Sequence, residues 1–328
     1  MGGNKVKTTN HRRLTNVYYN PRVSGSYAGA RGLKRRLKGQ VSGDDVTEWL
    51  RGQEPYTLHK TPRRRFKRRK TIVAGINEQW QCDLIDLSRL KKHNRGKTFV
   101  LTSIDVFSKV ADAVPLANKT SSEMIRGLKI LFKRAQKVPR TLQTDKGREF
   151  LNGPVQAYLK KVGVHHFVTE NDDIKAAVVE RFNRTLKERL WRYFTRHKTL
   201  HYLKVLPMLV SSYNRSFHRS IGMAPADVTW ENQEKVWHRL YEKDTKRKTP
   251  KAKLKVGDKV RLSHTRRTFK KGYLPAWTKE IFVVTSVLKT QPVTYKLVDS
   301  TGEALLGSFY DQELQRVKTE TPVRWVKT

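Results

Sequence analysis

The sequence predicts an α/β fold in which a mixed β-sheet is covered by helices on both faces, with a small helical region before it and a small β-barrel after it. Three observations support this prediction. Strand patterns in the middle of the chain pass into alternating helices and strands, residues 25–58 hold short helical patterns, and five short strand patterns crowd into roughly the last 70 residues. A chain of 328 residues has room for two or three such domains.

The N-terminal part is expected to form short helices behind a disordered basic tail. Leu33 and Leu37 are four residues apart and therefore share one helix face. Val46 and Trp49 share a face in a second helix. Residues 60–70 then carry eight Lys or Arg in eleven positions, which cannot pack against one another. This run is interpreted as a linker, a DNA-contacting arm or a nuclear-import signal.

The central region alternates between strand and helix patterns. The predicted strands are residues 79–87, 98–105, 110–116, 141–144 and 164–168, and the predicted helices are 120–136, 154–162, 176–194 and 203–213. Thr120 and Glu123 have the spacing of a capping box at the start of the first helix. The helix at 176–194 is amphipathic, with an apolar face (Val179, Phe182, Leu186, Leu190 and Tyr193) and a polar one (Glu180, Arg184, Lys187 and Trp191).

The C-terminal region is predicted to be a small barrel, because short strand patterns recur at 259–262, 281–288, 293–298, 304–309 and 314–317 with turn residues between them. Together these patterns divide the chain into segments. They are a disordered basic tail (1–24), a small helical region (25–59), a basic linker (60–71), the mixed α/β domain (72–230), a connector (231–254), the barrel (255–320) and a tail (321–328).

The charge of the chain points to nucleic acid. The formal net charge is +40, and residues 1–70, 71–230 and 231–328 carry +15, +14 and +11 of it. Since every part is basic, the expected partner follows the whole molecule, as a phosphate backbone does. A ribosomal-type or membrane-surface protein is the alternative. No stretch approaches the roughly 20 apolar residues of a membrane span.

The single cysteine, Cys82, limits which cellular compartment and which metal sites can be expected. One thiol cannot form a disulfide within the chain, which fits a reducing compartment, and it excludes a zinc ribbon that needs several thiolates. The N-terminus has no hydrophobic signal segment. An intracellular protein without membrane or zinc is therefore expected.

Three acidic residues stand in unusual settings. Asp83 interrupts an apolar strand, Asp145 ends a strand just before Gly147, and Glu180 lies on the polar face of the long helix. An unpaired carboxylate inside a strand is unfavourable unless cations neutralise it. Carboxylates suit Mg²⁺, and two such ions can promote displacement at phosphorus. The alternative for Glu180 is an ordinary surface pair with Arg184.

The motifs around these residues resemble the core of a retroviral-type integrase. They are Trp-Gln-Cys-Asp at 80–83, Ile-Asp-Val-Phe-Ser at 104–108, Thr-Asp-Lys-Gly at 144–147, Val-Glu-Arg-Phe-Asn-Arg-Thr-Leu-Lys at 179–187, and a segment over 213–225. Their order and spacing carry the resemblance over residues 72–230. Residues 255–277 look like the corresponding part of integrases from Polinton/Maverick-type transposons.

The resemblance implies an RNase H-like core in which Asp83, Asp145 and Glu180 are catalytic and hold two Mg²⁺ or Mn²⁺ ions. It implies trimming of 3′ DNA ends and strand transfer, hence a nuclease and transferase that acts as a homo-multimer on element ends and target DNA in the nucleus. The C-terminal segment would be an SH3-like or chromo-like barrel, with a chromatin contact as one use. DNA contacts are expected from Arg184, Lys187, Lys146, Arg148, Asn183, Arg65, Lys67 and Arg68.

The chain departs from the family pattern at two points. The 34 residues between Asp145 and Glu180 are one fewer than is usual, a change that the polar loop at 170–175 could absorb. The family's N-terminal His-His-Cys-Cys zinc module needs two thiolates and cannot form here.

Two other functions stay open, as does the role of the barrel. The first is a DNA-binding protein domesticated from a transposon with dispensable catalysis, and the second is an RNase H-type nuclease or junction resolvase. Basic residues favour phosphate contacts by the barrel (Lys259, Arg261, Arg266, Arg267, Lys270 and Lys271). Aromatic residues either line a cage for a methylated lysine or simply fill the core (Tyr273, Trp277 and Phe282).

Overall fold

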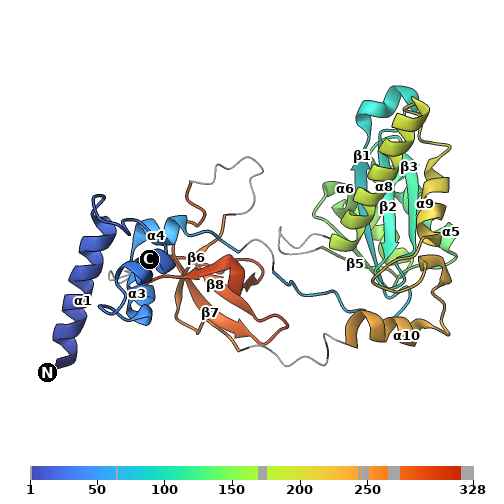
Figure 1. Ribbon diagram of the computed structural model, residues 1–328. Coiled ribbons are helices and arrows are strands. Elements are labelled where there is room, and N and C mark those ends of the chain that lie inside the picture. The colour runs from blue at the N-terminus through green and yellow to red at the C-terminus, as the bar shows by residue number, and fades with distance from the viewer. Residues whose placement is uncertain are drawn as a thin grey trace. The chain divides into compact units, whose positions relative to one another are not determined.

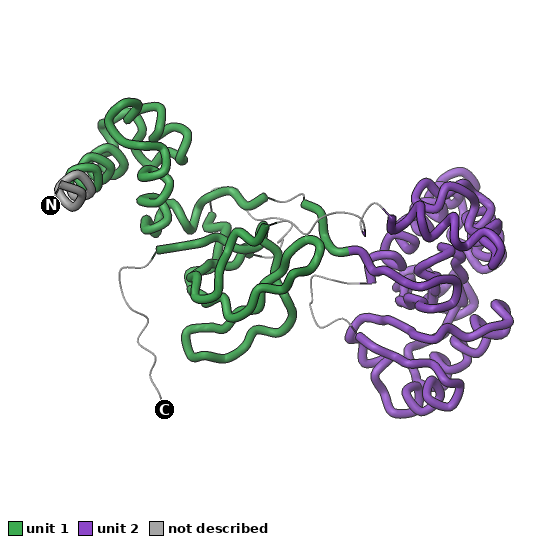
Figure 2. Tube along the Cα trace, turned by 90° about the horizontal axis from the view of Figure 1, so that it is seen from below, with its two compact units in different colours: residues 1–69, 248–328 green, residues 70–247 purple. Residues whose placement is uncertain are grey.

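The computed structural model describes residues 2–63, 66–168, 176–242, 245, 251–264 and 274–318, with side chains from residue 9 onward. The chain forms two compact units, one built from residues 1–69 and 248–328 and the other from residues 70–247 (Figures 1 and 2). In the described part of the chain, no helix combines the length and the apolar character needed to traverse a bilayer. The two units are described in turn.

The unit of residues 70–247 is built on a five-stranded mixed sheet, as predicted. Its strands are β1 (Gln79–Asp86), β2 (Phe99–Asp105), β3 (Ala111–Leu116), β4 (Thr141–Thr144) and β5 (His165–Val168). Their order is β3-β2-β1-β4-β5. The first three strands are antiparallel, whereas β4 runs parallel to both β1 and β5. Strand β1 therefore lies at the centre, between the antiparallel and the parallel halves.

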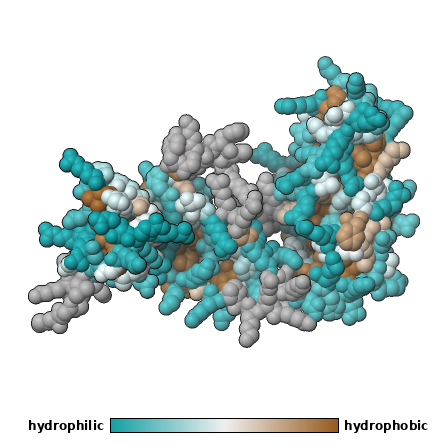
Figure 3. Space-filling view, viewed as in Figure 1, coloured by the Kyte–Doolittle hydropathy of each residue, from teal (hydrophilic) through white to brown (hydrophobic). Residues whose placement is uncertain are grey.

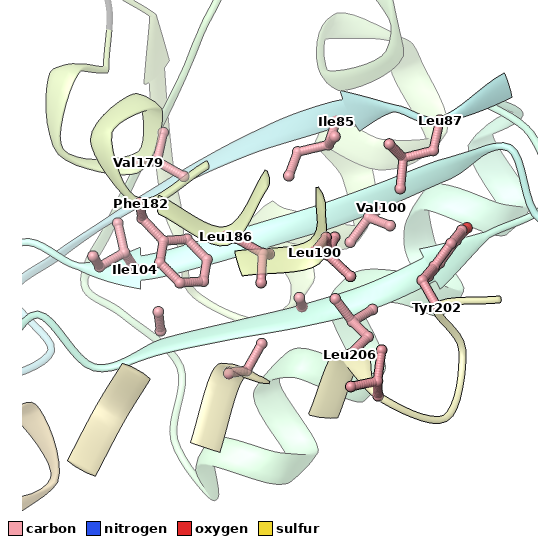
Figure 4. Close-up of a cluster of buried hydrophobic side chains, with 14 of the residues drawn as sticks. Ile85, Leu87, Val100, Ile104, Val179, Phe182, Leu186, Leu190, Tyr202 and Leu206 are labelled. Atoms are coloured by element: carbon pink, nitrogen blue, oxygen red, sulfur yellow. The ribbon is translucent and has the colours of Figure 1, made fainter. Parts of the chain in front are cut away.

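Helices cover both faces of this sheet (Figure 1). One face packs against α5 (Ser121–Ala135) and α7 (Gly153–Lys161), next to the short α6 (Arg148–Leu151), around side chains such as Trp80 and Leu142. The other face packs against α8 (Ala177–His197) and α9 (Leu206–Arg215). Figure 4 shows the second layer, where the buried side of α8 lies over strands β1 and β2. The α/β prediction is confirmed.

The amphipathic reading of α8 matches the described side chains. Val179, Phe182, Leu186 and Leu190 are at most 1% exposed and pack in this core (Figure 4). Tyr193 is only partly buried. The capping box at α5 does not form. The Glu123 carboxylate instead accepts the Ala117 N–H and pairs with Arg126, so it is unavailable to the backbone of Thr120.

The predicted connector is partly core. Helix α10 (Gln233–Trp237) continues into a π-helical turn at His238–Glu242. Val236, Leu240 and Tyr241 are buried against Val73 and Phe107. The unit therefore extends beyond residue 230, because this charged segment carries one apolar stripe that the sheet domain covers.

The N-terminal residues do not form a disordered tail. The first unit begins with α1 (Gly2–Tyr19), followed by α2 (Ala30–Arg36), α3 (Gly43–Leu50) and α4 (Glu54–His59). Leu14 and Tyr18 on α1 are 1% and 2% exposed, and they share a small core with residues of α2 and α3. The prediction for residues 1–24 was wrong because Leu14, Tyr18 and the partly buried Val17 lie on one helix face, and such a short apolar stripe suffices once other helices cover it.

The C-terminal strands of the first unit form an antiparallel sheet. They are β6 (Lys259–Leu262), β7 (Phe282–Leu288), β8 (Thr294–Val298), β9 (Phe309–Tyr310) and β10 (Leu314–Arg316), in the order β10-β6-β7-β8-β9. Strand β9 is shorter than the predicted 304–309, since Ala304 makes only an isolated bridge to Val298. A core of Val260, Val284, Tyr295 and other apolar residues lies on the sheet.

The basic run after α4 packs along this sheet instead of acting as a free linker. The Trp277 indole N–H donates to the Lys60 carbonyl at 2.5 Å, and the Arg69 N–H donates to the Tyr310 hydroxyl at 3.0 Å. Arg68 forms an ion pair with Glu313 at 3.1 Å. Phe66, whose ring contacts Tyr310, supplies the apolar anchor that the run of cations obscured.

Candidate carboxylate site

The pairing of β1 with β4 brings two of the predicted acidic residues to one place. The strands are parallel, and Gln81 is paired with Gln143. Asp83 and Asp145 each follow two residues later, so the same register carries them to the same level of the sheet. The Gly147 N–H donates to Asp145 Oδ1 at 3.0 Å, which orients this exposed carboxylate at the start of the turn after β4.

Helix α8 adds the third acidic residue. Its first turn is bound to β1, because Gln81 Oε1 accepts the N–H groups of Val178 and Val179 at 2.9 and 3.1 Å. Farther along, Asn183 Nδ2 donates to Asp83 Oδ2 at 2.8 Å. Glu180 lies between these two contacts along the helix and is exposed. The helix therefore crosses β1 at the level where Asp83 and Asp145 lie.

The electrostatics of Asp83 reflect this convergence. Partial burial is the largest cause that raises the pKa of Asp83 above its usual value, and the charges of Asp145 and Glu180 raise that pKa further. Hydrogen bonds from the Leu84 N–H and from Asn183 oppose the rise. Two carboxylates from separate parts of the chain thus act on Asp83.

The donor set fits a hard divalent cation. Mg²⁺ prefers carboxylate oxygens, and it would offset both the burial that chiefly raises the pKa of Asp83 and the smaller contribution from the charges of Asp145 and Glu180. The buried Asn183 Oδ1, beside Asp83, has no hydrogen-bond partner. Among the residues that the structure describes, no three His, Cys, Asp or Glu side chains lie close enough together to hold a metal. The carboxylates of Asp83, Asp145 and Glu180 therefore lie in the same region without forming a compact metal-binding cluster in this structure.

The raised pKa of Asp83 predicts an unusual effect on stability. A carboxyl whose pKa is higher in the folded state stabilises that state only in its protonated form, and this advantage is lost as pH rises through the folded pKa. Near pH 7, without divalent metal, Asp83→Asn should therefore raise the thermal unfolding temperature of its unit. The gain should vanish when the pH falls below the usual carboxyl pKa of about 3.9.

Asp86→Asn is the matched control for this measurement. A hydrogen bond from the Ser88 N–H lowers the pKa of Asp86, so the loss of its charge should lower the unfolding temperature at neutral pH. Both variants remove one negative charge from the same strand, which cancels the effect on net charge. Thermal unfolding followed by circular dichroism would contradict the account if both variants shifted in the same direction.

The predicted DNA-contacting residues divide into several groups. Arg184 and Lys187 are exposed on the side of α8 that carries Glu180, and Lys146 and Arg148 are exposed after β4. Asn183 does not fit the expectation, because it is only 6% exposed and donates to Asp83. In the other unit, Lys67 is exposed and Arg68 is paired with Glu313, while Arg65 lies outside the described residues.

Of the two alternatives for the aromatic residues of the C-terminal region, core filling is confirmed for two of the three residues, and the aromatic cage is excluded for those two. Trp277 and Phe282 are 3% and 5% exposed and belong to the interior. Tyr273 lies outside the described residues, as do Arg266, Arg267, Lys270 and Lys271. Arg261 is also buried, and it donates to the carbonyls of Thr278 and Lys279. Its charge is therefore used inside the fold.

The sequence patterns did not identify two buried polar residues near the carboxylates, Gln81 and Gln143. Gln81 and Gln143 are buried and joined by a hydrogen bond, and Gln81 also binds the start of α8. The available signal was a glutamine two residues before Asp83 and another two residues before Asp145, on the same strand face as each acid. Only the pairing of β1 with β4 shows that these two side chains meet.

Known proteins resemble this chain in both sequence and structure. Residues 74–172 match the integrase core domain family. The chain is 36% identical over 200 residues to an uncharacterized transposon-derived protein of Caenorhabditis elegans, which covers 61% of this chain and 67% of the relative. It is 27% identical over 146 residues to the retrovirus-related Pol polyprotein from transposon 412 of Drosophila melanogaster, which covers 44% of this chain and 11% of the polyprotein.

A solved structure has a similar fold. It is a chain of the simian T-cell lymphotropic virus intasome, determined by cryo-electron microscopy in complex with PP2A regulatory subunit B56 gamma. The TM-score is 0.58 at 16% identity, and the match covers 90% of this chain and 97% of the viral one. At this identity the likeness concerns the fold alone.

Proposed function

This chain belongs to the retroviral-type integrase family, and we propose that it is an active polynucleotidyl transferase that trims the 3′ ends of an element's DNA and joins them to target DNA. One observation carries the proposal. The parallel register of β1 with β4 carries Asp83 and Asp145 to the same level of the sheet, and hydrogen bonds to Gln81 and Asp83 hold the start of α8, which carries Glu180, against β1. A fold that serves only to bind DNA has no use for three mutually repelling acidic groups within a strongly basic chain.

Asp83, Asp145 and Glu180 would hold the divalent cations. When bound, Mg²⁺ or Mn²⁺ would activate the attacking oxygen and stabilise the leaving oxygen of an in-line displacement at phosphorus. The protein's own groups keep the carboxylates in place, since Asn183 donates to Asp83 and the Gly147 N–H donates to Asp145. In the first reaction water attacks a phosphodiester and frees a 3′-hydroxyl. In the second that hydroxyl attacks a phosphodiester of the target and releases a target 3′-hydroxyl.

Binding to DNA follows from the charge and its placement. Hydrophilic residues predominate on the face of the molecule seen in Figure 3. On α8 the exposed Arg184 and Lys187 follow Glu180 by one and two turns, where they can meet the backbone of a strand whose phosphate lies at the carboxylates. We further propose that the protein works in the nucleus as a homo-multimer on element ends and target DNA.

Replacement of either cation should weaken DNA binding in a salt-dependent way. Each phosphate contact releases counterions, so Arg184→Ala or Lys187→Ala should reduce the slope of log K against log salt by about one unit. Arg192→Ala serves as the control, since Arg192 lies farther along α8 and near Glu188. Fluorescence anisotropy with duplex DNA at several salt concentrations measures the slopes. Unchanged slopes for Arg184→Ala and Lys187→Ala would rule out these contacts.

The activity itself is tested with the full chain and duplexes that carry the terminal sequence of the element. We expect joined products in Mg²⁺ and none in EDTA. DNA binding without any cleavage would identify a domesticated binding protein and overturn the proposal. Hydrolysis of RNA–DNA hybrids without joining would instead identify an RNase H-type nuclease.

A further inference from the structure

Three buried glutamines lie on β1 and β4, shortly before Asp83 and Asp145 in the sequence. Gln79, Gln81 and Gln143 are 8%, 2% and 5% exposed. Gln143 Oε1 accepts hydrogen bonds from the side-chain amides of both Gln79 and Gln81, each at 2.8 Å. Buried amides are unfavourable unless their hydrogen bonds are made, so this network holds its members in one arrangement.

The network extends into α8 through Gln81. The first N–H groups of a helix lack partners within the helix and are usually satisfied by a side chain at the N-cap. The N-cap of α8 is Ala176, which has no side-chain acceptor. Gln81 Oε1 replaces it by accepting the N–H groups of Val178 and Val179. The cap of α8 therefore comes from β1, 97 residues away from Val178 in sequence.

The same sequence spacing of two residues relates the network to each of the three acidic residues. Gln81 precedes Asp83 by two residues, Gln143 precedes Asp145 by two, and Val178 precedes Glu180 by two. In β1 and β4 a step of two residues keeps the side chain on the same face of the sheet. A displacement of Gln81 against Gln143, or of Gln81 against the first turn of α8, would thus displace one carboxylate against another.

We propose that Gln81 and Gln143 are positioning residues that fix the mutual placement of Asp83, Asp145 and Glu180 and so set the affinity of the site for divalent metal. This inference rests on the proposed function. Glutamine suits the role because its amide donates and accepts at once without adding charge next to three carboxylates. Methionine has a similar shape but lacks the N–H donor and the carbonyl acceptor, so it removes the network with little change in volume.

The first test does not depend on activity. In the full chain, Gln81→Met should speed hydrogen exchange of the amides in the first turn of α8 by roughly tenfold, since two hydrogen bonds to that turn are lost. Exchange in strands β2 and β3 should stay unchanged. The control is Gln156→Met on α7, whose amide donates to the Phe150 carbonyl of α6 and forms a hydrogen bond with His166 of β5.

The second test measures metal affinity. Loss of groups that orient metal ligands typically lowers metal affinity or activity by about 10–100-fold. The Mg²⁺ concentration that gives half of the metal-induced thermal stabilisation should rise by that factor in Gln81→Met, as should the concentration for half-maximal strand transfer. DNA affinity should match the wild type, and Gln156→Met should change neither Mg²⁺ concentration.

The outcomes separate this inference from the proposed function. A wild-type chain that binds Mg²⁺ but joins no DNA would contradict the proposed function. The hydrogen-exchange and Mg²⁺-binding measurements would still test the role of the glutamine network. Wild-type exchange at the start of α8 in Gln81→Met, or faster exchange with an unchanged Mg²⁺ requirement, overturns the inference. Should Gln81→Met fail to fold, Gln143→Met takes its place, because it leaves Gln81 bound to α8 and should raise the Mg²⁺ requirement in the same direction. An unchanged requirement in Gln143→Met would also overturn it.

Discussion

Replacing Glu180 with Gln should lower strand transfer by at least about 1000-fold. Stabilisation by a bound metal contributes several kcal/mol to such a reaction, and each 1.36 kcal/mol corresponds to a factor of ten. Glutamine keeps the size of the side chain and removes the negative charge of Glu180, which acts on Asp83 and would bind metal. Glu180 is exposed on α8, so the fold should tolerate the change.

Glu188→Gln is the matched control, because Glu188 is an exposed acid on the same helix and lies near Arg192. It should leave strand transfer within about twofold, in line with the small contribution of exposed ion pairs. Products are quantified from labelled duplexes in Mg²⁺ under single-turnover conditions. Equal activity of the two variants would remove Glu180 from the site, and with it the proposed mechanism.

Leu14→Ala should destabilise the N-terminal helices by about 2–5 kcal/mol, the usual range for a leucine removed from a core. Leu14 is 1% exposed and packs with Tyr18, Leu33 and Leu50. A disordered tail would show no such effect. The same substitution at Leu306, which is 76% exposed in the same unit, should change stability by less than about 0.5 kcal/mol.

Hydrogen exchange is the suitable measurement for this pair of variants, because a chain with two compact units need not unfold in one step. Leu14→Ala should speed exchange in peptides from α2 and α3, whereas Leu306→Ala should leave those peptides as in the wild type. Equal exchange in the two variants would mean that α1 does not stabilise its neighbours.

Several elements could be predicted from the sequence because their signals are local. The apolar face of α8 recurs with helical spacing and agrees with its buried side, and strand β6 was predicted with its observed bounds, Lys259–Leu262. The five strands of the mixed sheet were found to within one or two residues. Asp83 was identifiable because a charge inside an apolar strand requires a reason.

Predictions failed where a segment depends on partners distant in the chain. Helix α1 contributes Leu14, Tyr18 and the partly buried Val17 to a core, and the basic run contributes Phe66 as an anchor. Both segments were predicted to lie outside any core, because charged residues surround these few apolar side chains in the sequence. The strand predicted at 304–309 was too long, because the alternating pattern extends over more residues than take part in strand pairing. In the structure, only Phe309 and Tyr310 of β9 pair with β8.

The sequence by itself determined the acidic residues, the elements that carry them and the family motifs around them, because residue type, spacing and periodicity are local properties of the chain. Only the tertiary structure decided that β4 lies beside β1 and that Gln81 caps α8, so that Asp145 and Glu180 come near Asp83 next to a buried glutamine network. The physical reason is that hydrogen bonds between residues such as Gln81 and Gln143, 62 positions apart, depend on strand pairing, and the glutamine that precedes each aspartate does not by itself show which strands pair.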